Sequence, residues 1–320
     1  MRAVHLDAGI VSVREIPAPA LPDGFARLRL RLAGICNTDL ELQRGYYGFS
    51  GVPGHEFVAD VIESCDASWI GKRVVGEINL ACQHCDWCAR GLQRHCPQRT
   101  VLGIVNHPGA FADELTLPVA NLHEVPADVP DEAAVFTEPL AAACEVLEQL
   151  PIGAGTRVAV LGDGKLGLLV AMVLQIRGAQ VDLCGRHESK MAIAARAGVR
   201  PIPGGTDSTD TSMDKYPVVV EATGSEDGLR AAITRTLPRG TIVMKSTVAR
   251  PVSVDMASVI VPEITLLGSR CGRFEDSLPF LAQGALPLAE MIAGEYPLAE
   301  APRAFSHAAR KGTLKVLLRP

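Results

Sequence analysis

The 320-residue sequence predicts an α/β protein of two parts, a β-rich, barrel-like part followed by a doubly wound parallel sheet. Three observations support this fold class. Residues 1–122 form short alternating segments separated by Gly and Pro, residues 131–150 form a helical pattern, and strand and helix patterns alternate from residue 157 onward. Closely spaced short strands are typical of a barrel, whereas strands that alternate with helices indicate parallel βαβ units.

Composition and charge favour a globular protein and exclude several partners. Hydrophobic residues make up 48% of the sequence and charged residues 21%, which describes a well-filled interior. The net charge of -5 gives no broad basic surface for nucleic acid or anionic lipid. Charged residues precede any signal-peptide core, and the longest apolar run, 166–174, is too short to span a bilayer. We therefore expect a cytoplasmic protein with no nucleic-acid and no membrane partner.

The first part predicts strands at its start and a helix at its end. In residues 26–32, leucine alternates with arginine, which is the period of a strand with one buried face. Residues 131–150 are rich in Ala, Leu and Glu and follow a proline-containing segment, so we predict one helix that Pro151 and Gly153 end. The loops of this part are expected to carry the chemistry.

The second part predicts a series of βαβ units. The expected strands are 158–161, 181–184, 218–221, 241–244 and 264–267, and the expected helices are 166–176 and 189–197. This alternation implies a parallel doubly wound sheet. The residues after 268 are too few for a separate domain and are expected to pack onto the first part. The predicted domains are residues 1–147 with 271–320, and residues 148–270.

Four of the nine cysteines lie close together in the first part. Cys82, Cys85, Cys88 and Cys96 have the spacing C-x2-C-x2-C-x7-C. One short loop with this spacing can place four thiolates around a single Zn²⁺ and leave no open position, as in a structural zinc site. A pair of disulfides is the alternative, but short Cys-x2-Cys spacing in a chain without an export signal favours metal. We predict a structural-zinc lobe at about residues 80–98.

A second set of metal ligands comes from two loops. Cys36 is followed by His55 and Glu56, so a thiolate, an imidazole and a carboxylate are available together. Mixed ligands with a vacant or water-filled position suit a catalytic zinc. Glu138, near the start of the predicted helix, is either a further ligand that exchanges with Glu56 or water, or an acid that stabilises a helix N-terminus.

Residues 162–167 match the dinucleotide fingerprint G-x-G-x-x-G. Gly162, Gly164 and Gly167 lie between a predicted strand and the predicted helix that begins at Leu166. In that context the glycines let the backbone approach a pyrophosphate at the helix N-terminus. We therefore predict a cofactor-binding site formed by these three glycines and Leu166.

The residues after the second strand of this unit bear on the choice of cofactor. An NAD enzyme normally ends that strand with an acid that binds the ribose 2′-hydroxyl. Here Arg186 stands at that place, so the sequence favours NADP, with Arg186 and Lys190 receiving the 2′-phosphate, and leaves NAD possible. Asp182 is the competing candidate for the ribose-binding acid, but it lies inside the strand, where its side chain would point into the protein interior. Alternatively, Arg186 is a solvated loop cation.

Together these residues resemble the zinc-containing medium-chain dehydrogenases, the group that includes alcohol, sorbitol, glucose and threonine dehydrogenases. The similarity runs through almost the whole chain. It is carried by Cys36 with Thr38-Asp39, Gly54-His55-Glu56, the four-cysteine lobe, Thr137-Glu138-Pro139, the loop 162–167 and the segment 312–318. The order Glu138-Pro139-Leu140 resembles the polyol, glucose and threonine branch more than the branch with a cysteine in this region.

The resemblance implies a fold and a chemistry. It implies a GroES-like catalytic domain, a Rossmann domain, an active site in the cleft between them, and a homodimer or homotetramer. It also implies two zinc ions per chain and hydride transfer between NAD(P) and a small secondary alcohol of polyol or sugar-like type, or the matching ketone. Thr38 would pass on the proton of the substrate hydroxyl. Glu41 joins the candidate catalytic residues because it stands where many relatives carry a proton-relay histidine.

Two other functions fit parts of the sequence. A zinc-free enone or quinone reductase on the same scaffold would not need the cluster of Cys36, His55 and Glu56. A non-enzymatic zinc- and nucleotide-binding protein would not need Thr38 beside a full set of ligands. The residues that are present therefore favour the zinc-dependent dehydrogenase.

Overall fold

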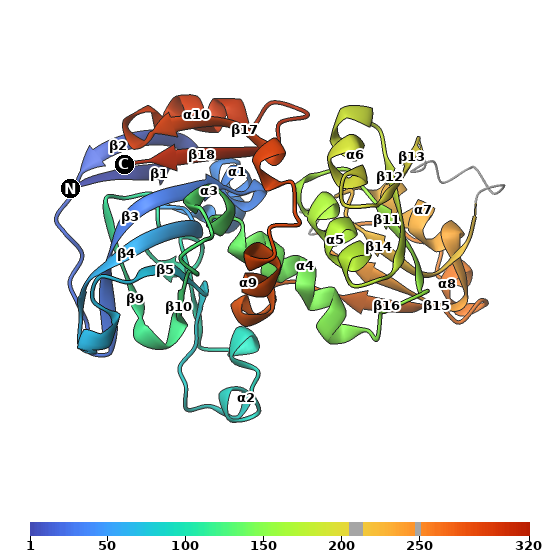
Figure 1. The fold of residues 1–320 in the computed structure, drawn as a ribbon, viewed down its shortest axis with the longest axis horizontal. Coiled ribbons are helices and arrows are strands. Elements are labelled where there is room, and N and C mark those ends of the chain that lie inside the picture. The colour runs from blue at the N-terminus through green and yellow to red at the C-terminus, as the bar shows by residue number, and fades with distance from the viewer. Residues whose placement is uncertain (205–213, 247–250) are drawn as a thin grey trace. The chain divides into compact units, whose positions relative to one another are not determined.

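The computed structural model describes residues 1–204, 214–246 and 251–320. These residues form two compact units (Figure 1). The first unit comprises Met1–Glu138, Ser277–Ala282 and Met291–Pro320, and the second comprises Pro139–Asp276 and Gln283–Glu290. The C-terminal segment thus groups largely with the first unit. The domain boundaries expected at 147/148 and 270/271 stay predictions.

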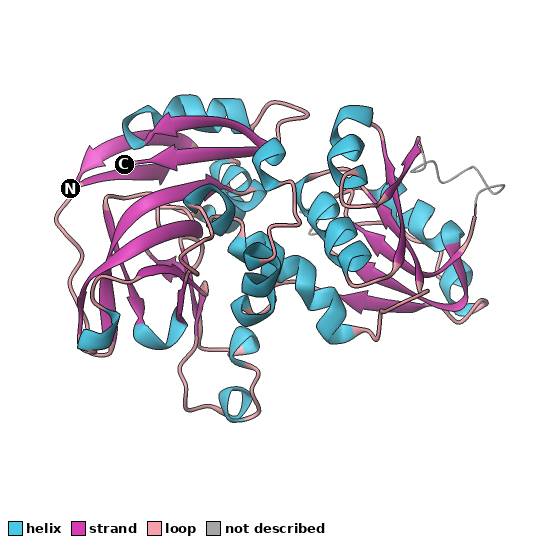
Figure 2. Ribbon diagram, viewed as in Figure 1, coloured by secondary structure: helices cyan, strands magenta, loops and turns pink. Residues whose placement is uncertain are grey.

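The first unit is rich in strands (Figure 2). Its strands are β1 (Arg2–Asp7), β2 (Ile10–Glu15), β3 (Phe25–Ile35), β4 (Glu56–Ser64), β5 (Arg73–Gly76), β6 (Asn79–Leu80), β7 (Thr100–Leu102), β8 (Asn106–His107), β9 (Glu114–Pro118), β10 (Leu122–Glu124), β17 (Ile292–Pro297) and β18 (Lys315–Arg319). Seven of them form one sheet in the order β10-β5-β4-β3-β18-β17, with β9 also paired to β3. Strand β3 is therefore the centre of this unit.

Strand β3 confirms the alternation expected for residues 26–32. Leu28, Leu30 and Leu32 are buried, whereas Arg29 and Arg31 are exposed. The inward leucines contribute to the core of the sheet, and burial of each leucine stabilises the fold by roughly 1.5–3 kcal/mol. Strand β18 pairs antiparallel with β3, placing Val316 opposite Ile35. The last strand of the chain thus completes the sheet of the first unit.

The second unit contains a six-stranded parallel sheet. Its strands are β11 (Arg157–Leu161), β12 (Gln180–Gly185), β13 (Arg200–Pro203), β14 (Tyr216–Glu221), β15 (Thr236–Met244) and β16 (Thr265–Gly268). They lie in the order β13-β12-β11-β14-β15-β16, and each neighbouring pair is parallel. This is the strand order 3-2-1-4-5-6 of a doubly wound dinucleotide-binding sheet, and the order reverses between β11 and β14. The predicted parallel sheet is confirmed.

Helices cover both faces of this sheet. Figure 1 shows α5 (Lys165–Ile176) and α6 (Glu188–Ala195) on one face, with α7 (Glu226–Arg235) and α8 (Ala257–Ile260) on the other. The expected helix 166–176 is confirmed, and the helix expected at 189–197 ends two residues earlier. Strand β13 and helix α7 were not predicted. Among the described residues, no helix is long and apolar enough to cross a membrane.

The single helix expected at 131–150 is wrong. It is divided into α3 (Asp131–Ala134) and α4 (Thr137–Gln149). Pro139 explains the break, because it has no N–H to donate to the carbonyl of Val135, four residues earlier. The remaining helices are α1 (Asn37–Gln43), α2 (Asp86–Ala89), α9 (Phe274–Ala282) and α10 (Ala301–Ala308). Short 3-10 helices lie at Tyr46–Gly48, Ala67–Trp69, Gln93–His95, Val119–Asn121, Leu288–Met291 and Leu298–Glu300.

Candidate metal and cofactor sites

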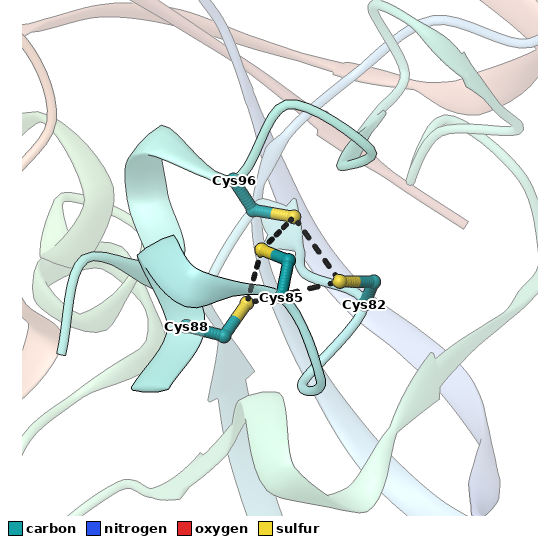
Figure 3. Close-up of side chains that lie close together, drawn as sticks. All are labelled: Cys82, Cys85, Cys88 and Cys96. Atoms are coloured by element: carbon teal, nitrogen blue, oxygen red, sulfur yellow. Dashed lines mark hydrogen bonds between the residues drawn. The ribbon is translucent and has the colours of Figure 1, made fainter. Parts of the chain in front are cut away.

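Four cysteine side chains converge in the lobe between β6 and β7. Figure 3 shows the Sγ atoms of Cys82, Cys85, Cys88 and Cys96 pointing toward one another. Cys85 is the N-cap of α2, and Cys88 lies within this helix, so one helical turn places two of the four thiols. The sequence-predicted set is thus brought together by the fold.

The spacing of these thiols fits a tetrahedral ion. The Sγ–Sγ distances are 3.9 Å for Cys82–Cys88, 3.6 Å for Cys85–Cys88, 3.7 Å for Cys85–Cys96 and 3.6 Å for Cys82–Cys96. Four thiolates each about 2.3 Å from a Zn²⁺ would be about 3.8 Å apart. The backbone N–H of Cys82 is the largest influence on Cys96 and helps lower the pKa of its thiol to about 6. All nine cysteines are free thiols, so the disulfide alternative is not seen.

A second convergence joins the two loops that the sequence singled out. One ligand atom from each of Cys36, His55 and Glu56 lies within 4.8 Å of the others. Cys36 directly follows β3, and Glu56 begins β4. The two strands pair antiparallel with Gly34 opposite Glu56, so the end of one strand meets the start of the next. This register explains how residues far apart in the sequence share one site.

Asp39 orients this group. Its Oδ2 accepts the backbone N–H of Cys36 at 2.8 Å, which fixes the start of α1. Its Oδ1 lies 3.5 Å from Nδ1 of His55, and both side chains are buried. Burial lowers the pKa of His55, but the charges of Asp39 and Cys36 outweigh it and set the pKa well above its usual value. The negative charges that favour a positive imidazole here would also favour a metal cation bound at the same site.

Lys315 is the buried partner of Glu56. Its ammonium group donates a hydrogen bond to Glu56 Oε2, and each side chain is only 1% exposed. Burial lowers the pKa of Lys315, whereas the charges of Glu56 and Cys36 raise it above the usual value. Gly34 leaves room for this pair, because a Cβ there would lie 2.6 Å from Glu56 Oε2. Glu56 therefore has a cationic partner with which a metal would have to share it.

The other predicted residues of this site lie at different distances from the ligands. Thr38 Oγ1 is 3.7 Å from Cys36 Sγ, so it belongs to the site. Glu138 is outside the three-ligand group but acts electrostatically on Lys315, so it lies near it. Glu41 pairs with Arg44 on the same helix at 2.5 Å, partly exposed to solvent. The structure thus places Thr38 beside the candidate ligand Cys36, and Glu41 in a surface ion pair.

The glycine-rich loop has the open space that a dinucleotide requires. Gly162 has φ of 114°, and a Cβ on Gly167 would lie 2.0 Å from the carbonyl oxygen of Gly162. A Cβ on Gly164 would meet nothing within 4 Å. Gly164 is the N-cap of α5 and makes no side-chain cap, so N–H groups of the first turn face this space. Leu166 lies half-buried in the same turn.

The residues after β12 are arranged around one carboxylate. Asp163, inside the glycine-rich loop, accepts the backbone N–H of Arg186 and of His187. Arg186 is exposed and Lys190 is half-buried. Asp182 points into packing, as expected, because it accepts hydrogen bonds from Arg200 and Tyr216. Asp182, the alternative candidate for an acid that binds the ribose of NAD, therefore makes its hydrogen bonds inside the protein.

Sequence reasoning gave no role to three residues, Asp39, Lys315 and Asp163, that the structure places beside the candidate sites. Asp39 had a signal, since an acid three residues after the helix N-cap is a capping pattern. Lys315 and Asp163 had none, because each acts on a residue far away in the chain, Lys315 on Glu56 and Asp163 on Arg186. Only the fold brings those partners together.

Comparisons with known proteins agree with this geometry. The "Alcohol dehydrogenase GroES-like domain" family matches residues 22–127, and the "Zinc-binding dehydrogenase" family matches residues 166–283. L-threonine 3-dehydrogenase of Streptomyces avermitilis is 31% identical over 328 residues, which cover 95% of this chain and 94% of that protein. D-altritol 5-dehydrogenase of Agrobacterium fabrum is 28% identical over 316 residues, which cover 94% of each chain.

A solved structure extends the agreement to the whole fold. A Sinorhizobium meliloti protein described as a zinc-binding dehydrogenase, solved with NADP bound, has a TM-score of 0.91 and 27% identity, and the match covers 100% of this chain and 99% of that chain. A GroES-like domain joined to a Rossmann domain defines the class, the NAD(P)-dependent oxidoreductases that act on alcohols. The chain belongs to the zinc-binding, medium-chain dehydrogenase family, as the resemblance implied.

Proposed function

We propose that this protein is a zinc-dependent dehydrogenase that transfers hydride between NADP and a secondary alcohol of polyol or sugar-like type. The observation that supports it most is the convergence of half-buried Cys36 with buried His55 and Glu56, beside Thr38. A relative that oxidises D-altritol and another that oxidises L-threonine support a substrate with several polar groups around its carbinol carbon.

The first part of the proposal is the set of metal ligands. Cys36, His55 and either Glu56 or Glu138 would hold a catalytic zinc ion, which supplies Lewis acidity toward the substrate oxygen when bound. Glu138 is favoured over Glu56 as the third protein ligand, because Glu56 is already paired with Lys315. Cys82, Cys85, Cys88 and Cys96 would hold the structural ion.

The second part is proton transfer by this chain's own residues. Thr38 Oγ1 accepts a hydrogen bond from the substrate hydroxyl and passes its proton toward solvent. Asp39 holds the start of α1, and with it Thr38, in place through the N–H of Cys36. Glu41, three residues after Thr38 on α1, is the next acceptor, and its carboxylate also pairs with Arg44.

The third part is cofactor choice. The glycine-rich loop would bind the pyrophosphate, and Arg186 with Lys190 would bind the 2′-phosphate. Gly185 ends β12 and Arg186 follows it, so the strand itself carries no acid at its end to bind a ribose 2′-hydroxyl. The dinucleotide supplies the hydride acceptor when bound. NAD is the alternative cofactor, and the ratio of the two affinities distinguishes them.

The experiment measures reduction of NADP and NAD across polyols, aldoses, hydroxy amino acids and simple secondary alcohols, with and without a zinc chelator.

Cys36→Ser and His55→Ala should abolish turnover and leave NADP binding within about twofold of wild type, because the loop of Gly162 to Gly167 is intact. Cys65→Ser is the control, since Cys65 is an exposed cysteine of the same unit. Undiminished turnover in Cys36→Ser would overturn the zinc mechanism and favour the zinc-free enone or quinone reductase. Tight NADP binding with no turnover of any substrate would favour the non-enzymatic alternative.

Two further properties belong to the proposal. Nine free thiols favour the reducing cytoplasm as its location. Within the described part of the chain, no strand pairs with the outer edge of β16. This edge, together with exposed Leu266, favours a homo-oligomer that joins copies through the second unit.

A further inference from the structure

One carboxylate of the glycine-rich loop holds the turn between β12 and α6. Asp163 Oδ2 accepts the backbone N–H of Arg186 at 2.7 Å and that of His187 at 2.6 Å. Nδ1 of His187 lies 3.1 Å from Oδ1 and 3.0 Å from Oδ2 of Asp163. Because a carboxylate only accepts, Nδ1 is the nitrogen that donates. Asp163 therefore fixes both the backbone of this turn and the imidazole ring of His187.

Asp163 also takes the space of a side chain on β12. A Cβ on Gly185 would lie 2.6 Å from Asp163 Oδ2, so the carboxylate and any side chain at position 185 exclude each other. Position 185 is the last residue of β12, next to Arg186, at the strand end where an NAD enzyme carries its ribose-binding acid. In this chain the acid comes instead from the glycine-rich loop. Only 8% of Asp163 is exposed, and its oxygens already accept hydrogen bonds from the turn.

The guanidinium is the donor of this turn that remains outside the carboxylate. The side chain of Arg186 is exposed, and that of His187 is half-buried. Because Nδ1 of His187 donates to Asp163, Nε2 of the neutral imidazole is an acceptor, so of these two side chains Arg186 is the one that can donate to a phosphate. Burial raises the pKa of Asp163, but the donors of His187 and Arg186 outweigh it and set the pKa below its usual value. Asp163 is thus ionised, and its charge is offset by its own partners.

We propose that Asp163 is the positioning residue of the 2′-phosphate site, holding the turn so that the Arg186 guanidinium binds the phosphate. This rests on the proposed preference for NADP. Asp163 could also have the opposite effect on NADP affinity, since an uncompensated carboxylate beside a phosphate would repel it. Removal of Asp163 weakens NADP binding if the carboxylate positions the turn, and strengthens it if repulsion dominates.

The test is calorimetric binding of NADP, NAD, 2′,5′-ADP and 5′-AMP to the full-length protein, with no need for a known substrate. Asp163→Ala should weaken NADP and 2′,5′-ADP by about tenfold and leave NAD and 5′-AMP within about threefold, because charge-assisted phosphate contacts are lost. Asp182→Asn is the matched control, a carboxylate on β12 that bonds to Arg200, and it should leave the NADP-to-NAD ratio unchanged.

A double variant tests whether Asp163 acts through Arg186. If it does, Asp163→Ala adds little to the NADP loss already caused by Arg186→Ala, since coupled residues are not additive. Additive losses, an unchanged ratio in Asp163→Ala, or tighter NADP binding would each overturn the inference. Should Asp163→Ala fail to fold, Gly185→Ala displaces the same carboxylate sterically and should shift the ratio in the same direction.

The two proposals fail in different ways. If the preference for NADP is wrong, Arg186→Ala weakens NADP and NAD equally. If only the role of Asp163 is wrong, Arg186→Ala weakens NADP selectively and Asp163→Ala leaves the ratio unchanged.

Discussion

Lys315 is a cation with almost no contact with water, and Glu56 is its direct partner. The ring of Phe136 lies beneath its ammonium group, with 5.6 Å between Nζ and the ring centroid. Removing one member of a buried pair leaves the other charge without compensation in a medium that solvates it poorly. At the scale of single residues, stability of the first unit is therefore tied to a candidate metal ligand.

We expect Lys315→Met to lower the free energy of unfolding by about 3 to 5 kcal/mol in the metal-free protein, because Glu56 becomes a buried unpaired charge. The matched control is Lys72→Met, which breaks a pair with Glu124 whose side chains are 36% and 55% exposed. That change should cost below about 1 kcal/mol. Urea unfolding of both variants measures the difference, and equal losses would contradict the expected dependence on burial.

At the scale of elements, the cysteine lobe has little apolar interior of its own. Trp87, within α2, is exposed, so the ion rather than packing is expected to hold this loop. Cys96→Ser should reduce the zinc content of the purified protein from about two ions to about one per chain and make residues 82–96 sensitive to proteolysis. Cys65→Ser should change neither property. Full zinc content in Cys96→Ser, measured by mass spectrometry, would contradict the structural site.

The pH dependence of stability should report on the polar cluster that joins β12, β13 and β14. Burial raises the pKa of Asp182, but hydrogen bonds from Arg200 and Tyr216 outweigh it and set the pKa below its usual value. Because the folded-state pKa is the lower one, this carboxylate stabilises the fold above about pH 4, and the stabilisation is lost as the pH falls through the folded-state pKa.

Asp182→Asn should therefore be less stable than wild type at pH 7, with a difference that shrinks as the pH falls through the folded-state pKa of Asp182. Urea unfolding of both proteins between pH 2.5 and pH 7 measures it. Asp23→Asn, at an exposed position of the first unit, serves as the control. A difference that grows as the pH falls would show that the sign is wrong.

At the scale of the whole molecule, exposed apolar side chains gather in the segment from α8 to β16. Ile260 is 66% exposed, Val261 82% and Leu266 39%, next to the outer edge of the parallel sheet. Unpaired edges with apolar neighbours favour association. Val261→Glu with Leu266→Lys should therefore lower the mass of the proposed homo-oligomer in light scattering. Ile10→Lys, which changes an exposed apolar residue of β2, should leave the mass unchanged, and the reverse pattern would place the interface elsewhere.

Most of the fold could be predicted from the sequence because its signals are local. The alternation in residues 26–32 and the glycine-rich loop each lie within a few residues, so period and turn chemistry reveal them. The helix expected at 131–150 was wrong because Pro139 was given too little weight against a helical composition. Strand β13, with two prolines in Arg200–Pro203, has a weak strand pattern and was missed.

The candidate sites divide in the same way. Ligand sets with short spacing, such as Cys82 to Cys96, could be predicted because the chain itself keeps them near one another. The charges that complete the sites could not, because Lys315 and Glu56 lie 259 positions apart and only β-sheet register unites them. Sequence patterns report on ligands, whereas the electrostatic neighbours of those ligands depend on long-range topology.

The position of β18 has a consequence for biosynthesis. Strands β1 to β10 of the first unit leave the ribosome before the second unit does, yet their sheet lacks β17 and β18, and Glu56 lacks its counter-charge, until Lys315–Arg319 emerges. The six-stranded sheet of the second unit is complete once Thr265–Gly268 has been made. Folding during translation therefore runs against the order of the chain: the unit begun first is finished last, and until then it exposes an unsatisfied strand edge that chaperones can recognise.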